Sequence, residues 1–307
     1  MNKKVYIATK LYSFFDRKVS NIIYDTLVDN QLFSESDIYL PFKESNMKVS
    51  CEGNIANNIF QADILAMDKS HLLLTRLDGV SYDAGVGFEI GFFLASKKDV
   101  IIINTDFLST KDNYDKEFKL SKIADYFINV RNYIYNNNNK LSYSEELDYN
   151  IDLFKNYICD IINTKLKENF IAERNDNESI YDLFIDLSGL KYEWSKVLLT
   201  KIKTIVIKKQ LKIWISDRYS KSYDVKEDIE ALMNSSKFLT CYDENEPDFD
   251  SCILQGIAFK NKIEIIGYES NPVKFFVKDK QEMGVSLMLE QSASCIVNKI
   301  NDLETIL

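Results

Sequence analysis

Residues 71–91 read HLLLTRLDGVSYDAGVGFEIG, and this stretch decides the fold class. Its apolar start, His71–Leu77, predicts a buried strand, and the apolar segment Val86–Ser96 predicts a helix after it. Glycines and acidic residues fill the junction between the two. Ligands of parallel α/β sheets bind beyond the carboxyl ends of the strands, so we expect a site at this junction.

The same alternation of strand and helix extends to both sides. Further strands are predicted at Lys4–Ala8, Asp37–Phe42 and Asp99–Asn104, and further helices at Asp16–Leu27 and Asn54–Ser70. Alternating strands and helices are typical of parallel βαβ units whose sheet is covered on both faces. We therefore predict an α/β fold with a parallel, flavodoxin-like or Rossmann-like sheet.

Residues 180–307 repeat this pattern in outline. Met67 and Gly91 align with Met233 and Gly256, and the two separations differ by a single residue. This alignment predicts a diverged internal duplication, although any two α/β domains could align this well by chance. Two such domains in one chain would mimic a symmetric dimer.

The predicted domains are residues 1–172 and 180–307. The first ends in a long amphipathic helix, Leu147–Leu166, which we expect to pack the two halves together. The second domain looks like a degenerate, non-catalytic copy, because Leu254 stands where the first half has Glu89.

The composition excludes several classes of protein. The chain has 307 residues, 38 Lys and Arg against 47 Asp and Glu, and a net charge of −9, which disfavours nucleic-acid binding. The five cysteines form no CxxC pair and His71 is the one histidine, so a disulfide framework, a metal site and a Ser-His triad are disfavoured. No apolar stretch resembles a signal peptide or a membrane span, so we expect a cytoplasmic protein.

The junction holds the residues that could carry chemistry. Asp78, Asp83 and Glu89 lie within twelve residues of one another, and Gly85 and Gly87 allow close approach of the backbone. We expect Glu89 in the first turn of the helix, where the helix dipole would stabilise an ionised carboxylate that could act as a nucleophile. The alternative is that these acids only cap the helix and form turns.

The pair Gly85-x-Gly87 is not a dinucleotide-binding fingerprint. Ile90 stands where the third glycine is required, and the motif opens the wrong βα unit. We therefore expect no nicotinamide cofactor.

Several segments together resemble the nucleoside 2-deoxyribosyltransferase family. They are IFQADILAMD at Ile59–Asp68, LDG at Leu77–Gly79, DAGVGFEIG at Asp83–Gly91, TDF at Thr105–Phe107, YIA at Tyr6–Ala8 and YLP at Tyr39–Pro41. The resemblance covers about residues 3–108.

The resemblance implies a role for each matching residue. Glu89 matches the nucleophile that attacks C1′ of the sugar, and Asp83 matches the carboxylate that contacts the sugar and organises the nucleophile. Asp63 matches the acid that protonates the departing base, and Tyr6 the tyrosine near the nucleophile. Asp78, Gly85 and Gly87 would line the substrate site, and no metal or organic cofactor is needed.

The chain departs from the family pattern at three places. Lys10 replaces part of a Gly-Pro pair, and either contacts a substrate phosphate or lies in a solvated loop. Ser45 takes roughly the place of a residue that reads the base. The family's Asn-Leu-Met motif, which a neighbouring subunit supplies, is missing from the first half, but Ser286 and Met288 occupy a comparable motif in the second. The second domain could therefore be a built-in partner.

The leading hypothesis is an enzyme that cleaves N-glycosidic bonds of nucleosides or nucleotides through a covalent glycosyl-Glu89 intermediate. Transfer of the 2-deoxyribosyl group to another base and hydrolysis by water, with a nucleotide or NAD as substrate, are both open. A non-catalytic nucleotide-binding or regulatory module is the alternative from another class. The expected partner is a small nucleoside or nucleotide, and a homo-oligomer and an internal pseudo-dimer are both compatible with the sequence.

Overall fold

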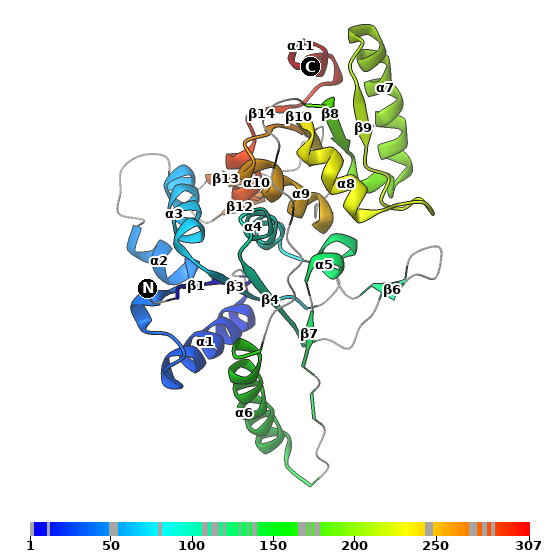
Figure 1. Ribbon diagram of the computed structural model, residues 1–307. Helices are drawn as coiled ribbons and strands as arrows, with labels where there is room; N and C mark the ends of the chain where they lie inside the picture. The colour runs from blue at the N-terminus through cyan, green and yellow to red at the C-terminus, as the bar shows by residue number, and fades with distance from the viewer. Residues whose placement is uncertain are drawn as a thin grey trace. The chain divides into compact units, whose positions relative to one another are not determined.

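The computed structural model, shown in Figure 1, describes most of the chain. The described residues are 3–10, 13–48, 55–78, 82–105, 110–111, 117–118, 121–128, 130–133, 135–136, 140–164, 171, 174, 179–242, 248–269, 275–277, 281–283 and 286–307. They fall into two compact units. The first comprises Met1–Tyr82, Lys98–Ser109 and Phe127–Asn169, and the second comprises Asp83–Lys97, Thr110–Tyr126 and Phe170–Leu307.

The first unit contains a five-stranded sheet in the order β2-β1-β3-β4-β7. Its strands, all parallel, are β1 (Val5–Ala8), β2 (Ile38–Tyr39), β3 (Leu72–Arg76), β4 (Asp99–Asn104) and β7 (Arg131–Asn132). Its helices are α1 (Phe14–Asp29), α2 (Pro41–Lys48), α3 (Ile55–Lys69) and α6 (Tyr143–Ile162), with a 3₁₀ turn at Glu35–Asp37.

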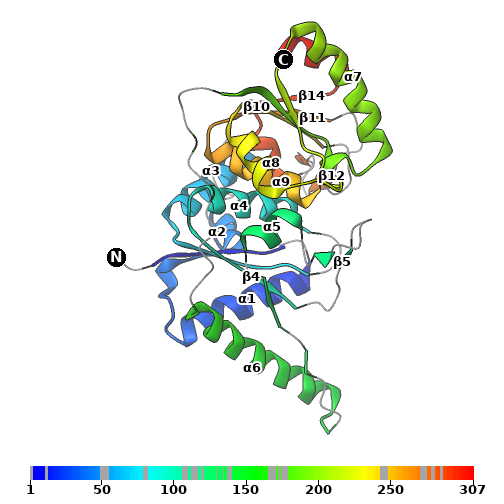
Figure 2. The same ribbon diagram turned by 45° about the vertical axis from the view of Figure 1, so that its right-hand side comes forward.

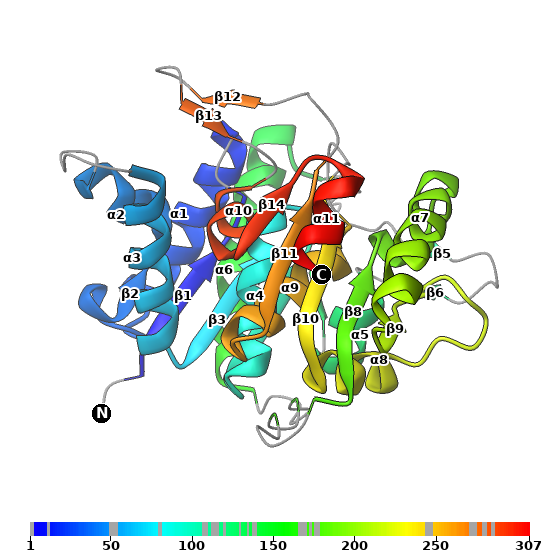
Figure 3. The same cartoon turned by 90° about the horizontal axis from the view of Figure 1, so that it is seen from above.

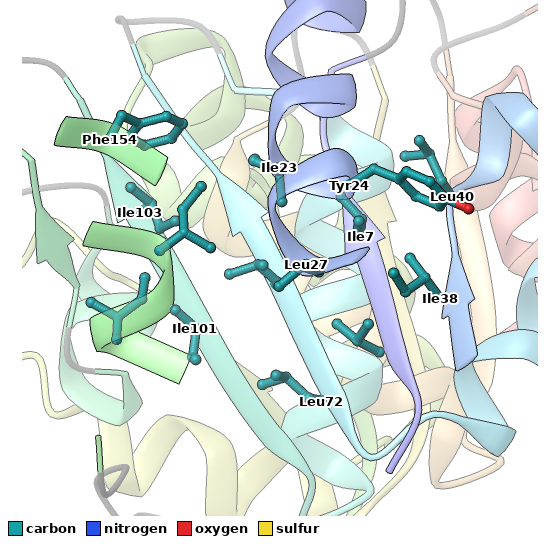
Figure 4. Close-up of a cluster of buried hydrophobic side chains, with 14 residues drawn as sticks. Ile7, Ile23, Tyr24, Leu27, Ile38, Leu40, Leu72, Ile101, Ile103 and Phe154 are labelled. Atoms are coloured by element: carbon teal, nitrogen blue, oxygen red, sulfur yellow. The ribbon is translucent and has the colours of Figure 1, made fainter. Parts of the chain in front are cut away.

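Helices α1 and α6 pack beside each other against one face of this sheet (Figure 1). Ile7, Leu74 and Ile103 point to this face from neighbouring strands, because alternate residues of a strand share a side, and they meet Leu27 of α1 and Phe154 of α6 (Figure 4). The expectation that the long helix packs the two halves together is therefore wrong: its apolar face forms part of the first unit's core. The helix begins at Tyr143, before the predicted Leu147, because its N-cap Ser142 forms a capping box with Glu145.

The second unit contains a parallel sheet with the matching strand order, β14-β11-β10-β8-β9, as Figure 3 shows. Its strands are β8 (Tyr181–Asp186), β9 (Ile213–Ile215), β10 (Ser235–Cys241), β11 (Glu264–Tyr268) and β14 (Cys295–Val297). Its helices are α4 (Ala84–Ala95), α5 (Lys122–Phe127), α7 (Glu193–Lys209), α8 (Val225–Met233), α9 (Phe249–Lys260), α10 (Leu287–Ser292) and α11 (Ile300–Ile306).

Smaller elements complete this unit. They are the two-stranded antiparallel pairs β5 (Thr110–Lys111) with β6 (Glu117–Phe118) and β12 (Phe275–Val277) with β13 (Gln281–Met283), and a 3₁₀ turn at Ser188–Leu190. The apolar core joins β8, β10 and β11 to α7 and α11.

Helix α4 follows β3 in the sequence but packs along α9 in the second unit (Figure 2). A Cβ atom on Gly91 would overlap the carbonyl oxygen of Ile253, and one on Gly256 would overlap that of Phe88. The two helices can cross this closely only because both positions are glycine. The contacts are reciprocal. Gly91 of α4 lies against Ile253 of α9, and Gly256 of α9 lies against Phe88 of α4, and each carbonyl belongs to the residue three positions before the glycine of its own helix.

The predicted fold class is confirmed: the chain contains two parallel five-stranded sheets with helices, the architecture of two Rossmann-like domains. One strand was predicted too long. Asp37–Phe42 was expected to be a strand, but β2 ends at Tyr39 and Pro41 begins α2, where its fixed φ suits the first helical position. Among the described residues, no helix is both long and apolar enough to cross a membrane.

Candidate functional site

Two of the predicted site residues, Tyr6 and Asp63, meet at one side of the first sheet. Tyr6 of β1 is fully buried, and its ring stacks on that of Tyr39 in β2 with centroids 5.2 Å apart. The Tyr39 hydroxyl donates a hydrogen bond of 2.7 Å to Oδ1 of Asp63, a residue on the buried face of α3. The structure thus joins Tyr6 and Asp63 through Tyr39, and the Tyr39 bond fixes the orientation of the Asp63 carboxyl group.

Asp78, at the end of β3, has both carboxylate oxygens occupied. Oδ1 accepts a bond of 2.5 Å from the Thr105 backbone amide, and Oδ2 accepts one of 2.6 Å from the Thr105 hydroxyl. Arg76 lies 3.4 Å from Oδ2 and also pairs with Asp16 at 2.7 Å. These contacts tie the carboxyl ends of β3 and β4 together.

Asp83 is the N-cap of α4. Its Oδ1 accepts bonds from the amides of Gly85 at 2.8 Å and Val86 at 3.2 Å, two donors that the first turn of a helix leaves without intrahelical partners. The helix therefore begins at Ala84, two residues before the predicted start.

This earlier start corrects the expectation for Glu89. The residue lies in the second turn of α4, and no acidic residue lies in the first turn. The field of the helix dipole falls off within the first turn, so the dipole contributes less to Glu89 than the sequence suggested. Glu89 is a buried carboxyl group, 6% exposed, in a helix whose residues from Ala84 to Leu94 are all buried.

Gly85 and Gly87 bring α4 close to segments from the C-terminal half. The side chains of Met288 and Ser286 come within 3.4 and 3.6 Å of the Cβ position of Gly85, and Cys252 comes within 2.7 Å of that of Gly87. The segment that was predicted to act as a built-in partner therefore lies against the glycine-rich start of α4, within the second unit.

The two other predicted positions are less defined. Lys10 follows β1 and is partly buried. Ser45 lies in α2, and its side chain is outside the described residues.

The second sheet has a site-like cluster of its own, which the sequence analysis did not find. Arg218 is 1% exposed, and its guanidinium group donates to Asp186 at 2.9 Å, to the α9 N-cap Asp248 at 2.6 Å and to the Ser251 hydroxyl at 2.8 Å. Asp250 lies 4.0 Å from Nε. Burial would lower the pKa of Arg218, but the three carboxylates outweigh it and hold this pKa above its ordinary value.

Asp250 belongs to the same cluster. It accepts bonds from the backbone amides of Lys122 at 3.2 Å and Ile123 at 3.1 Å, and so anchors the start of α5. Burial raises the pKa of Asp250 to about 6, with Asp248 adding to the effect and Arg218 opposing it.

A further acid of the second unit occupies a position that resembles that of Asp63. Asp228 of α8 accepts a bond of 2.7 Å from Nε1 of Trp214 in β9, just as Asp63 accepts one from Tyr39 in β2. Burial raises the pKa of Asp228, and hydrogen bonds from Ser216 and Trp214 oppose this shift. The signal was present in the sequence, because Asp228 follows Asp63 by the same interval that separates Gly256 from Gly91.

No group of three His, Cys, Asp or Glu side chains that could hold a metal ion occurs among the described residues. Cys159, Cys241, Cys252 and Cys295 are free thiols.

Comparison with known proteins gives one match. The model of the family described as nucleoside 2-deoxyribosyltransferase matches residues 5–151, which include β1, α3, α4 and the start of α6. No curated protein matches the chain. The resemblance drawn from the sequence motifs is thus confirmed for residues 5–151, which are similar to the nucleoside 2-deoxyribosyltransferase family, a family of glycosyltransferase-type enzymes.

Proposed function

We propose that this protein cleaves the N-glycosidic bond of deoxynucleosides or nucleotides and transfers the 2-deoxyribosyl group to another nucleobase. The observation that carries the proposal is a buried carboxyl group, Glu89, within the segment that matches the family model and at the position that the motif resemblance assigns to the nucleophile. A residue that only favoured a helix terminus would be expected at the surface and in the first turn.

The proposed reaction has two displacements at one carbon. In the first, a Glu89 oxygen forms a bond to C1′ as the bond from C1′ to the base nitrogen breaks, and the base leaves with its electron pair and takes a proton. In the second, a nitrogen of the incoming base attacks C1′ as the bond from C1′ to the Glu89 oxygen breaks and releases the carboxylate, and the proton of that nitrogen passes to the acid that protonated the first base. Two inversions give net retention of configuration, as in retaining glycosidases.

The other acids support this chemistry in different ways. Asp63 would protonate the departing base, and its bond from Tyr39 supports the role by holding the carboxyl group in one orientation. Asp83 would organise the sugar site, and its capping bonds give it a fixed position at the start of the helix that carries Glu89. Tyr6 would lie near the nucleophile.

The second half of the chain would complete the site. Met288 of α10 and Ser286, the N-cap of α10, lie next to Gly85, which supports the proposal that this half supplies in one chain what a neighbouring subunit supplies elsewhere in the family.

We also infer that the second half arose by internal duplication and lost its activity. The matching strand orders, the reciprocal contacts of Gly91 and Gly256, and the two N-cap acids Asp83 and Asp248 support a common origin. Leu254, fully buried at the position that corresponds to Glu89, cannot attack a sugar.

The first test is the variant Glu89→Gln, which keeps the shape of the side chain and removes the nucleophile. We expect the release of base from a deoxynucleoside to fall by at least about 1,000-fold, while the melting temperature changes little. Liquid chromatography of the reaction mixture measures this release. Turnover at the wild-type rate would refute the nucleophile assignment.

A second assay separates transfer from hydrolysis. Wild-type protein is incubated with a deoxynucleoside in the presence and absence of a second free base, and a new nucleoside forms only if the protein is a transferase. A slow 2-fluoro-sugar nucleoside should leave a sugar adduct on Glu89 that intact-protein mass spectrometry detects.

A further inference from the structure

A fully buried glutamine links the C-terminal segment next to Gly85 to the body of the second unit. Gln255, in α9, is 1% exposed. Its Nε2 donates bonds of 2.8 Å to the carbonyl oxygen of Leu289 and 2.8 Å to the hydroxyl of Ser292, and both acceptors belong to α10. Its Oε1 accepts a bond of 3.0 Å from the hydroxyl of Tyr242. Both the oxygen and the nitrogen of the Gln255 amide group therefore have hydrogen-bond partners.

Tyr242 gives this network a fixed end. Its ring is 2% exposed and lies over Gly267 of β11, where a side chain would overlap the ring. Burial raises the pKa of the phenol, so the hydroxyl remains protonated and acts as a donor. The hydrogen bonds therefore run in one direction: Tyr242 donates to Gln255, and Gln255 donates to the carbonyl oxygen of Leu289.

Helix α10 depends on such an anchor. It has six residues, far fewer than an isolated helix needs to be stable, so tertiary contacts must hold it in place. Gln255 holds its C-terminal half, and its other end presents Ser286 and Met288 to Gly85. Movement of α10 would move these two side chains away from the start of α4.

We propose that Gln255 is a positioning residue: through Leu289 and Ser292 it holds α10 so that Ser286 and Met288 close over Gly85 on the helix that carries Glu89. The proposal rests on the proposed function, because it assigns Gln255 a role in that reaction. Gln255 itself performs no chemical step.

The test compares two substitutions. Gln255→Leu removes every hydrogen bond that the Gln255 side chain makes, and leaves only the bonds that Tyr242 and Ser292 donate to the Leu289 carbonyl. Gln255→Glu keeps the shape, but an ionised carboxylate cannot donate to the Leu289 carbonyl, whereas a protonated one can donate to it and still accept from Tyr242. Burial raises the pKa of such a glutamate, so it should become protonated as the pH falls from 8 towards 5.5.

We expect both variants to lower kcat/KM for deoxynucleoside cleavage at pH 8 by about tenfold or more, because a displaced site segment costs rate. The ratio of Gln255→Glu to wild-type activity should rise as the pH falls, and the ratio for Gln255→Leu should not. Dividing the activity of each variant by the wild-type activity at the same pH removes the effect of the titrating catalytic acids, which is common to all the proteins. Ser235→Ala is the control: it removes a buried side-chain hydrogen bond to Ala231 in the same unit, away from α10, and should keep full activity.

Hydrogen exchange of the α10 amides provides a readout that does not need turnover. We expect faster exchange over residues 287–292 in Gln255→Leu than in wild type or Ser235→Ala. Wild-type exchange in Gln255→Leu, or a Gln255→Glu ratio that does not change with pH, would overturn the positioning role. An inactive wild-type protein would instead overturn the proposed function, so the two failures are distinguishable.

Discussion

The two sheets of this chain have the same strand order but carry different side chains at their edges. Each has an aromatic residue on its outer strand that donates a hydrogen bond to a buried acid on a helix later in the chain: Tyr39 to Asp63 of α3 in the first, Trp214 to Asp228 of α8 in the second. At the end of the central strands, Ala8 pairs in register with Thr75, whereas Asp186 pairs with Thr240.

Asp186, the carboxylate that the first sheet lacks at this position, has a buried arginine as its partner. In the second unit, Asp186 and the capping acid Asp248 both bind the buried Arg218, so the carboxylates neutralise a cation of the protein itself. Asp248 also accepts a bond from the amide of Ser251, as a helix cap does. The comparison teaches that an acid caps the helix in both places, whether the residue six positions later is a carboxyl group, Glu89, or an apolar side chain, Leu254.

The largest effect on stability is expected from Arg218→Ala. Removal of the guanidinium group leaves Asp186 and its neighbours as buried charges without a counterion, which should lower the free energy of unfolding by about 3–5 kcal/mol. The control is Arg76→Ala in the first unit, whose partly exposed pair with Asp16 should contribute about 1 kcal/mol or less. Urea denaturation measures both. Equal losses would show that the second unit's cluster is not the buried ion-pair centre described above.

The next effect concerns the reciprocal helix crossing. Gly91→Ala and Gly256→Ala each place a methyl group on a backbone carbonyl of the other helix, and each should cost about 3 kcal/mol through overpacking. The two variants serve as controls for each other in thermal denaturation. A large loss in one and none in the other would break the equivalence of α4 and α9.

The smallest effect compares the two buried acids that accept a hydrogen bond from an aromatic side chain. Tyr39→Phe and Trp214→Phe each remove a hydrogen bond to a buried acid and should each cost about 1 kcal/mol of stability. Tyr39→Phe should also lower kcat/KM by about tenfold, since Asp63 loses the bond that orients it, and Trp214→Phe should not. Steady-state kinetics of both variants decides this, and equal activities would remove Tyr39 from the proposed site.

Much of the first half could be predicted from local pattern. The strand Asp99–Asn104 was expected with the bounds that the structure gives it, because a short, β-branched apolar run has few other solutions. The start of α4 was missed, since Ala84 and Gly85 carry no periodic apolar signal and the capping bonds of Asp83 begin the helix before the pattern does.

The Arg218 cluster could not be found in the same way. Arg218 is 32 residues from Asp186 and 30 from Asp248, and an arginine among polar residues reads as a surface side chain until its partners are known. The hydrogen bond from Gln255 to Leu289 joins residues that are 34 positions apart, and no sequence pattern indicates it.

The sequence by itself determined the α/β class, the resemblance of residues 5–151 to a known family and the identity of the acids at the proposed site, because periodicity and motif spacing are local properties of the chain. Only the tertiary structure decided that Glu89 lies in the second turn, that α4 packs on α9, that Arg218 is buried among carboxylates and that α10 lies beside Gly85. Those facts depend on which distant side chains meet when apolar surface is buried, and burial in turn sets the charge and hydrogen bonding of each polar group.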